Sequence, residues 1–216
     1  MKKRCLIFDF DGTLTDSYQL ENHAMAEAIR RFADPKFKDF EVLKYYGPTE
    51  DGIVRKLVPE DRADEAVAFL NEFYDSYQRE IKQKPFDGIK ELLEDYQKRV
   101  DIYLLTGRSL KTLELSLDYF GFRSYFKGLY TGSLTGINKA DNILKLCLDH
   151  QFDKRDVVYV GDTLEDIRSM SIAGVDIISA GYSHSKSYQD ELERNNPNMV
   201  VKSVSELRGV IEKLVD

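Results

Sequence analysis

The fold is decided by the stretch Cys5-Leu6-Ile7-Phe8-Asp9-Phe10-Asp11-Gly12-Thr13-Leu14-Thr15. Its short apolar run, followed closely by a glycine, is typical of a strand buried on both faces of a parallel sheet. Two carboxylates interrupt the run, and unpaired buried charge is costly unless a cation or a reaction requires it. Because side chains alternate along a strand, Asp9 and Asp11 lean toward the same face, and Gly12 permits a tight turn near a ligand. A simple Asp-Gly turn after an edge strand is the alternative.

Composition and charge limit the class of protein. The chain has 216 residues, enough for one domain or two unequal ones with a sizeable core. Its formal net charge of -7 argues against nucleic acid as a partner, because nucleic-acid-binding surfaces are normally basic. The two cysteines, Cys5 and Cys147, lie in apolar patterns without metal-ligand spacing, which predicts buried reduced thiols in a cytoplasmic protein. The N-terminal apolar run is too short for a signal peptide or a membrane span, so no membrane partner is expected.

Strand and helix patterns alternate from Gly88 to the end of the sequence. Further strands are expected at 101–106, 128–131, 156–161, 176–180 and 199–201, and helices at 88–98, 110–120, 138–150, 163–173 and 203–214. Ser109 and Ser203 are expected to cap two of these helices. The alternation predicts right-handed crossovers and a Rossmann-like parallel sheet with helices on both faces, an α/β fold.

Residues 17–84 do not fit this alternation. Their apolar residues recur at helical spacing, first in a helix at 19–32 that Asp16-Ser17 is expected to cap, and no convincing strand follows between 37 and 83. The pattern predicts an all-helical domain of residues 17–84 inserted after the first strand. The α/β core is then discontinuous and consists of residues 1–16 and 85–216.

Polar side chains follow the predicted strands. Asp9 and Asp11 end the first, 106–108 the second and 161–166 the fourth, while Lys139 lies in the connection after the third. Ligands of open α/β sheets bind at the carboxyl ends of the strands. Carboxylates that meet at one edge repel one another unless a hard divalent cation lies among them, and Mg2+ suits oxygen ligands. Mg2+, a lysine, a hydroxyl and backbone N–H groups suit a phosphoryl group, and one carboxylate remains available as nucleophile.

These segments resemble the four motifs of the haloacid dehalogenase-like hydrolase superfamily: Asp9-Phe10-Asp11-Gly12-Thr13, Thr106, Lys139 and Gly161-Asp162-Thr163-Leu164-Glu165-Asp166. The nearest group is the one that is similar to phosphoglycolate phosphatase and β-phosphoglucomutase, whose pattern Asp87-Gly88 and Ala173-Gly174-Val175 also resemble. The resemblance covers essentially the whole core. It places the helical insert where this family carries its type I cap.

The resemblance implies a role for each matching residue. Asp9 would attack phosphorus, and Asp11 would protonate the leaving alcohol and then deprotonate the attacking water. Thr106 and the Gly107 backbone N–H would hold phosphate oxygens, and Lys139 would offset charge between Asp9 and the phosphoryl group. The implied ligands of Mg2+ are the Asp9 carboxylate, the Asp11 carbonyl, Asp162 and, directly or through water, Asp166.

Several residues keep two interpretations. Gly47-Pro48-Thr49 resembles the cap loop that closes over substrate, although a plain interhelical turn explains it as well. Arg55 contacts an anionic substrate or is a solvated surface arginine, and Arg108 reaches the substrate or pairs with a carboxylate. Lys145 competes with Lys139 for the lysine role because Lys139 precedes Ala140-Asp141 where many relatives have proline. The three histidines form no ligand pattern and are expected to be structural or exposed: His23, His150 and His184.

The predicted function is hydrolysis of a small phosphorylated metabolite, of the phosphoglycolate kind, through an aspartyl phosphate and with Mg2+. A phosphomutase of the β-phosphoglucomutase type, or a pyrophosphatase on the same scaffold, is the alternative. A non-enzymatic sensor of phosphorylated ligands is disfavoured because every expected catalytic group is present. The partner is thus a small-molecule phosphate ester, and the sequence leaves the oligomeric state open.

Overall fold

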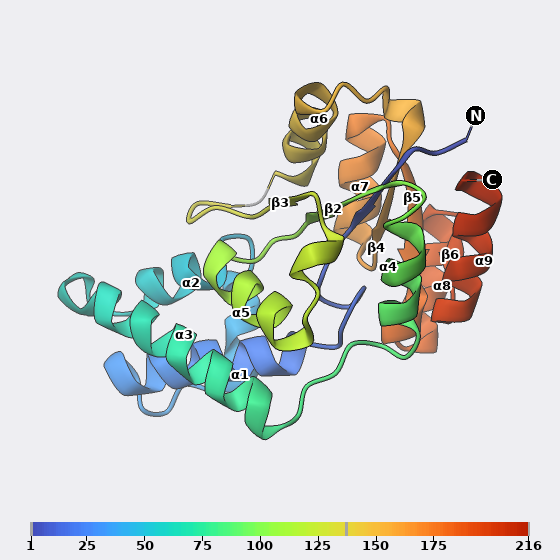
Figure 1. Cartoon of the computed structure of the whole chain (residues 1–216). Coiled ribbons are helices and arrows are strands. Elements are labelled where there is room, and N and C mark those ends of the chain that lie inside the picture. The colour runs from blue at the N-terminus through green and yellow to red at the C-terminus, as the bar shows by residue number, and fades with distance from the viewer. Residues whose placement is uncertain (1, 137, 216) are drawn as a thin grey trace.

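A six-stranded parallel sheet lies at the centre of the computed structural model, which describes residues 2–136 and 138–215 (Figure 1). The strand order is β3-β2-β1-β4-β5-β6, and all neighbouring strands pair in parallel. The strands are β1 (Cys5–Phe8), β2 (Asp101–Leu105), β3 (Gly128–Tyr130), β4 (Val157–Gly161), β5 (Asp176–Ala180) and β6 (Val200–Val201). The predicted sheet is therefore confirmed, with strand ends within one or two residues of those expected.

Helices connect and cover the strands. The described α-helices are α1 (Tyr18–Phe32), α2 (Glu50–Leu57), α3 (Ala63–Glu80), α4 (Ile89–Tyr96), α5 (Leu110–Phe120), α6 (Lys139–Asp149), α7 (Leu164–Ala173), α8 (Lys186–Asn195) and α9 (Val204–Val215). Short 3-10 helices occur at Asp39–Tyr45, Glu60–Arg62, Arg123–Tyr125, Lys154–Asp156 and Gly181–Ser183.

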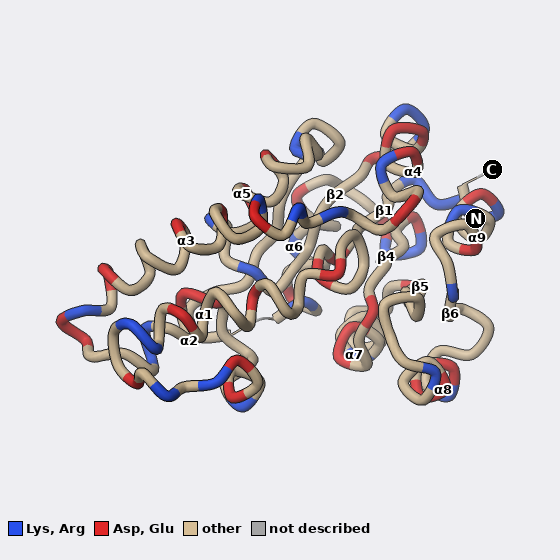
Figure 2. Tube along the Cα trace, turned by 90° about the horizontal axis from the view of Figure 1, so that it is seen from below, with Lys and Arg blue, Asp and Glu red and all other residues tan. Residues whose placement is uncertain are grey.

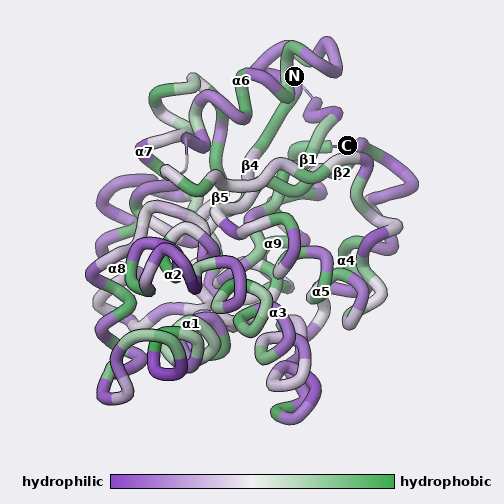
Figure 3. The backbone as a smooth tube through the Cα atoms, turned by 90° about the vertical axis from the view of Figure 1, so that its left-hand side faces the viewer, coloured by the Kyte–Doolittle hydropathy of each residue, from purple (hydrophilic) through white to green (hydrophobic). Residues whose placement is uncertain are grey.

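Alternate residues of β1 face two different helical layers. Leu6 and Phe8 share a buried cluster with residues of α4, α5 and α9, whereas Cys5 and Ile7 share another with residues of α6 and α7. Strands β1 and β2 are strongly hydrophobic, while the helices alternate hydrophobic and hydrophilic turns (Figure 3). This arrangement confirms the predicted α/β class, because a strand buried on both faces needs helices on both sides.

The helices α1, α2 and α3 pack on one another around a hydrophobic cluster of their own. Figure 1 shows them together on one side of the sheet, with α3 beside α5. The two connections to the sheet lie side by side, because Thr15 forms an isolated bridge with Pro85 and its hydroxyl bonds to Gln83 and Lys84. The segment thus leaves and re-enters the core at one place.

One local prediction was wrong, and one helix was not predicted. Ser17 precedes α1 but makes no side-chain cap, because its hydroxyl donates to Asp11 instead. Helix α8 was not predicted, since only Leu192 of its residues is buried and its sequence therefore lacks an apolar stripe. By contrast, Ser109 and Ser203 do accept bonds from the first turns of α5 and α9.

The surface carries charges of both signs. Acidic and basic residues lie close together on α4, α8 and α9 (Figure 2). Both cysteines are buried and unpaired, as predicted. None of the described helices has the length and hydropathy needed to cross a membrane.

Candidate active site

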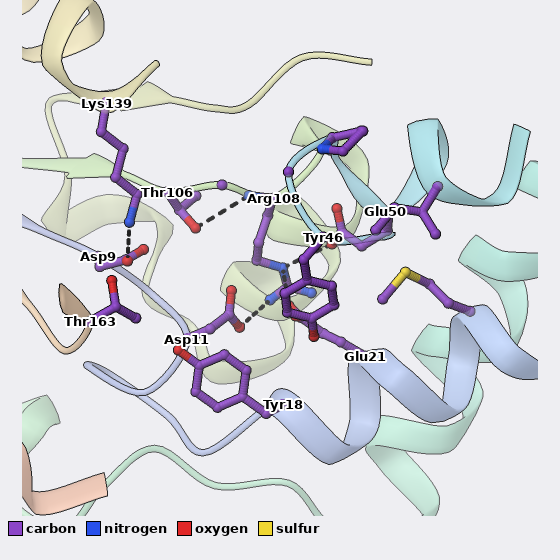
Figure 4. A pocket seen from close by; sticks show the side chains of 15 residues that line it. Asp9, Asp11, Tyr18, Glu21, Tyr46, Glu50, Thr106, Arg108, Lys139 and Thr163 are labelled. Carbon is purple, nitrogen blue, oxygen red and sulfur yellow. Dashed lines mark hydrogen bonds and ion pairs between the residues drawn. The ribbon is translucent and has the colours of Figure 1, made fainter. Parts of the chain in front are cut away.

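A cavity of about 150 Å³ lies between the carboxyl ends of the central strands and the helices α1 and α2 (Figure 4). Of the residues singled out in the sequence, the cavity is lined by Asp9, Asp11, Gly47, Thr106, Gly107, Arg108 and Lys139. Its other polar lining residues are Tyr18, Glu21, Tyr46, Glu50 and Thr163. The cavity therefore brings together residues that follow β1, β2 and β4, the lysine that begins α6 and residues of the inserted helical segment.

Lys139 links two carboxylates at the edge of the sheet. Its Nζ donates to Asp9 Oδ2 and lies 2.6 Å from Asp166 Oδ1. The other oxygen of Asp9 accepts a 2.7 Å bond from the Phe10 N–H. Asn138 caps α6 by accepting from the Asp141 N–H, so the lysine stands at the first position of a fixed helix. Lys139 thus lies at the edge of the sheet beside Asp9, whereas Lys145 is exposed further along α6.

Asp166 is held on both of its oxygens. Besides Lys139, its Oδ1 lies 3.3 Å from the Tyr159 hydroxyl, and its Oδ2 accepts from the N–H and hydroxyl of Thr163. Thr163 in turn caps α7. Burial alone would raise the pKa of Asp166, but Lys139 and Thr163 outweigh it and hold the pKa below its ordinary value. Asp166 therefore bridges Lys139 and the first turn of α7.

Asp162 presents one oxygen that the protein does not satisfy. Its Oδ2 accepts from the Tyr18 hydroxyl at 2.9 Å and lies 2.7 Å from His184 Nε2. Its Oδ1 is buried without a hydrogen-bond partner. Gly12 permits this packing, because a Cβ at that position would lie 2.1 Å from Asp162 Oδ2. A buried carboxylate oxygen with no donor is a place where a cation fits.

The three carboxylates form a cluster suited to a metal ion. Oxygens of Asp9, Asp162 and Asp166 lie within 4.8 Å of one another. Burial, reinforced by Asp166 and Asp162 and opposed by Lys139, raises the pKa of Asp9 to about 7. Burial also raises the pKa of Asp162, although His184 opposes it. A divalent cation among these oxygens would favour their charged forms. The donor set therefore fits Mg2+, which prefers oxygen ligands.

Arg108 occupies the opposite side of the cavity and contacts three carboxylates. Its Nη1 lies 3.7 Å from Asp11 Oδ1, and its Nε lies 3.1 Å from Glu21 Oε1 and 3.4 Å from Glu50 Oε1. The rings of Phe10 and Tyr74 lie 5.0 and 4.8 Å from the guanidinium carbon. Of the two interpretations of Arg108, the structure therefore shows pairing with carboxylates.

Glu50 ties α2 to the core. Its Oε2 accepts a 2.7 Å bond from the Ser109 N–H at the start of α5, and its Oε1 accepts from the Thr112 hydroxyl. An anion at a helix N-terminus is favourable because unpaired N–H groups point at it. Glu50 thus completes the first turn of α5 from another part of the chain.

Of the two substrate-contact candidates in the inserted helical segment, one lines the cavity and the other does not. Gly47 lines the cavity, as the predicted cap loop requires. Arg55 does not line it and instead pairs with Asp64, whose side chain is 92% exposed. Arg55 therefore lies at the surface, outside the cavity.

Sequence reasoning missed residues on both sides of the site. His184 was expected to be structural or exposed, yet it contacts Asp162, and a signal existed because it follows β5 by four residues at the same edge of the sheet. Tyr18, Glu21 and Glu50 carried no readable signal, since their helices contain many similar polar residues. Their position became visible only in the folded chain.

Comparison with known proteins identifies the family and the fold of the chain. Residues 6–180 match the family model described as haloacid dehalogenase-like hydrolase. The chain is 24% identical over 220 residues to the phosphoglycolate phosphatase of Vibrio parahaemolyticus, with 96% of each chain covered. It is 26% identical over 214 residues to a 5'-nucleotidase of Pseudomonas aeruginosa, covering 96% of this chain and 95% of the relative. A predicted phosphatase from Clostridium acetobutylicum has the same fold, with a TM-score of 0.76, 23% identity and coverage of 99% and 100%.

The chain therefore belongs to the haloacid dehalogenase-like hydrolase family. The predictions of the family and of an enzyme of the phosphatase kind are confirmed. The two named relatives act on different esters by their names, so family membership leaves the substrate open.

Proposed function

We propose that the protein is a Mg2+-dependent phosphatase that hydrolyses a small phosphorylated metabolite through an aspartyl phosphate on Asp9. One observation carries the proposal. Asp9 lines a cavity at the end of β1, bonded to Lys139 and within 4.8 Å of the carboxylates of Asp162 and Asp166. A carboxylate nucleophile beside a lysine and a cation site suits phosphoryl transfer, which depends on positioning and charge stabilisation.

The proposed reaction uses two carboxylates. The Asp9 carboxylate attacks phosphorus while Asp11 transfers its proton to the oxygen of the leaving alcohol. Asp11 then takes a proton from water, which attacks the phosphorus and releases phosphate from Asp9. Ser17 donates to Asp11 Oδ1 and fixes the rotamer of this side chain. Thr106 and Gly107, at the end of β2, line the cavity where they can hold phosphate oxygens.

Mg2+ would be held by Asp9, Asp162, the Asp11 carbonyl and, directly or through water, Asp166, which also contacts Lys139. When bound, the ion supplies positive charge to the phosphoryl oxygens. The unpartnered Oδ1 of Asp162 supports this assignment, since its other oxygen is occupied by Tyr18 and His184. The two neighbours thereby orient the carboxylate.

The helical segment of residues 17–84 is proposed as a cap domain on a core of residues 1–16 and 85–216. About half of the residues that line the cavity, including Gly47, belong to this segment, which supports the proposed role. Movement of such a segment would admit substrate and then exclude water during transfer. A cytoplasmic location remains part of the same proposal.

Phosphate release from a panel of small phosphate esters, with Mg2+ or with EDTA, tests the proposal. We expect release from one or a few esters in the presence of Mg2+, loss of activity in EDTA and recovery when Mg2+ is added back. Release that is insensitive to EDTA would contradict the metal site. Transfer to a second hydroxyl of a sugar phosphate without phosphate release would indicate the mutase instead.

A further inference from the structure

Tyr18 joins the inserted helical segment to the proposed metal site. It is the first residue of α1, and its side chain lines the cavity (Figure 4). Its hydroxyl donates a 2.9 Å hydrogen bond to Asp162 Oδ2. A phenol keeps its proton at neutral pH, so Tyr18 is the donor of this bond. A residue of the inserted segment is thus bonded directly to a carboxylate that follows β4.

The Asp162 carboxylate is held from two parts of the chain. Its Oδ2 contacts Tyr18 of the inserted segment and, at 2.7 Å, His184 Nε2, which follows β5 in the core. Asp162 is 0% exposed, so no solvent competes for these contacts. Its Oδ1, the oxygen left for a metal ion, has no hydrogen-bond partner among the described residues. The direction in which Oδ1 points therefore depends on both neighbours of Oδ2.

Partners of a metal-binding carboxylate affect the affinity for the metal, because they fix the orientation of the ligand. Loss of one such partner typically weakens metal binding about 10- to 100-fold. A coupling of this kind is reciprocal: the factor by which one contact strengthens metal binding is the factor by which bound metal strengthens that contact. The bond between Tyr18 and Asp162 crosses from the inserted segment to the core. Metal binding and the contact of α1 with the core are then linked.

We propose that Tyr18 is a positioning residue through which Mg2+ binding and the contact of α1 with the core strengthen each other. The inference rests on the proposed function, in which Asp162 holds Mg2+. His184 alone would keep Asp162 in place on the core side, whereas Tyr18 makes the metal site sensitive to the position of the inserted segment. The ion would thus stabilise the inserted segment against the core as well as supply charge.

The affinity for Mg2+ alone gives the first test. Tyr18→Phe removes the donor and keeps the ring, so the dissociation constant of Mg2+, measured by calorimetry without substrate, should rise about tenfold. The matched control is Tyr46→Phe, which removes a hydroxyl from the same cavity whose partner is Asn22. This control should leave the dissociation constant within about twofold. An unchanged dissociation constant in folded Tyr18→Phe, or equal rises in the two variants, would overturn the proposal.

Hydrogen exchange of the wild-type protein gives a second test that needs no variant to fold. Saturating Mg2+ should slow amide exchange in the first turns of α1 by up to about tenfold, since reciprocity gives the contact the same factor. In Tyr18→Phe this protection should be lost at a Mg2+ concentration that saturates the variant. Exchange of α1 that does not respond to Mg2+ in the wild-type protein would overturn the proposal.

These measurements separate the inference from the proposed function. A wild-type protein that binds no Mg2+ at millimolar concentration would contradict the metal site and, with it, the role of Tyr18. A protein that binds Mg2+ equally well with and without the Tyr18 hydroxyl would overturn the inference and leave the phosphatase proposal standing. A Tyr18-dependent affinity in a protein that hydrolyses no ester of the panel would support the inference and contradict the phosphatase.

Discussion

The two sides of the cavity are built around one cation each, but the chain holds these cations in different ways. Lys139 contacts Asp9 and Asp166, which stand at the end of β1 and in the first turn of α7. Arg108 contacts Glu21 and Glu50, which come from α1 and α2. The first set is positioned by the topology of the sheet, and the second by how the inserted helices pack on the core. The comparison teaches that carboxylates which follow a strand are placed by the sheet, whereas the carboxylates around Arg108 depend on the packing of the inserted helices.

Replacement of the proposed nucleophile should have the largest effect. Asp9→Asn removes the attacking oxygen but keeps the shape of the side chain and its bond to the Phe10 N–H, so kcat should fall by about 10³-fold or more. Phosphate release measures the loss, and circular dichroism checks that the fold is retained. Activity close to that of the wild-type protein would exclude Asp9 as nucleophile.

The two lysines of α6 provide a matched pair for the next test. Lys139→Met removes the cation between Asp9 and Asp166, and kcat/KM should fall by about 100-fold, as for loss of one group that stabilises developing charge. Lys145→Met changes an exposed lysine of the same helix and should leave kcat/KM within about twofold. Equal losses of kcat/KM in the two variants would contradict a special role for Lys139.

The contact of the inserted helices with the core depends on a close approach at Gly52. A Cβ there would lie 2.5 Å from the backbone oxygen of Leu134, so Gly52→Ala must push α2 away from the loop before α6. Displacement of the Glu50 side of the cavity should lower kcat/KM about tenfold. Gly209→Ala is the control, because a Cβ on α9 meets nothing within 4 Å and should leave kinetics unchanged. Unaltered kinetics in a folded Gly52→Ala protein would show that this contact is not needed.

Arg55 should give the smallest effect. It lies on α2 but outside the cavity, and its partner Asp64 is almost fully solvated. Arg55→Ala should change kcat/KM by less than about twofold and the free energy of unfolding by less than about 1 kcal/mol. A large rise in KM would instead support the sequence-based interpretation in which Arg55 contacts an anionic substrate.

The sequence was informative for candidate site residues that directly follow a strand. Asp9, Thr106 and Asp162 each come within two residues of a strand end, and parallel strands place these ends at one edge. Their meeting was therefore predictable from local pattern and topology. Lys139 was harder, since it begins a helix after a loop and Lys145 competed with it.

The other side of the cavity was not predictable for a physical reason. Helical spacing tells which face of α1 or α2 is apolar, but not which polar residue on the rim meets a second element. Glu21 and Glu50 are surrounded in sequence by similar carboxylates, and their burial results from tertiary packing against Arg108. His184 differs from them, because it follows β5 by four residues and its contact with Asp162 could have been predicted from that position.

Mapping of the phosphorylated residue tests the central claim most directly. The ester that the panel identifies as the best substrate is used with a radiolabelled phosphoryl group, the reaction is quenched in acid during turnover, and the labelled peptide is sequenced. We predict label on Asp9 in the wild-type protein and none in Asp9→Asn. Rapid turnover without labelled protein, or label on another residue, would contradict an aspartyl phosphate at Asp9.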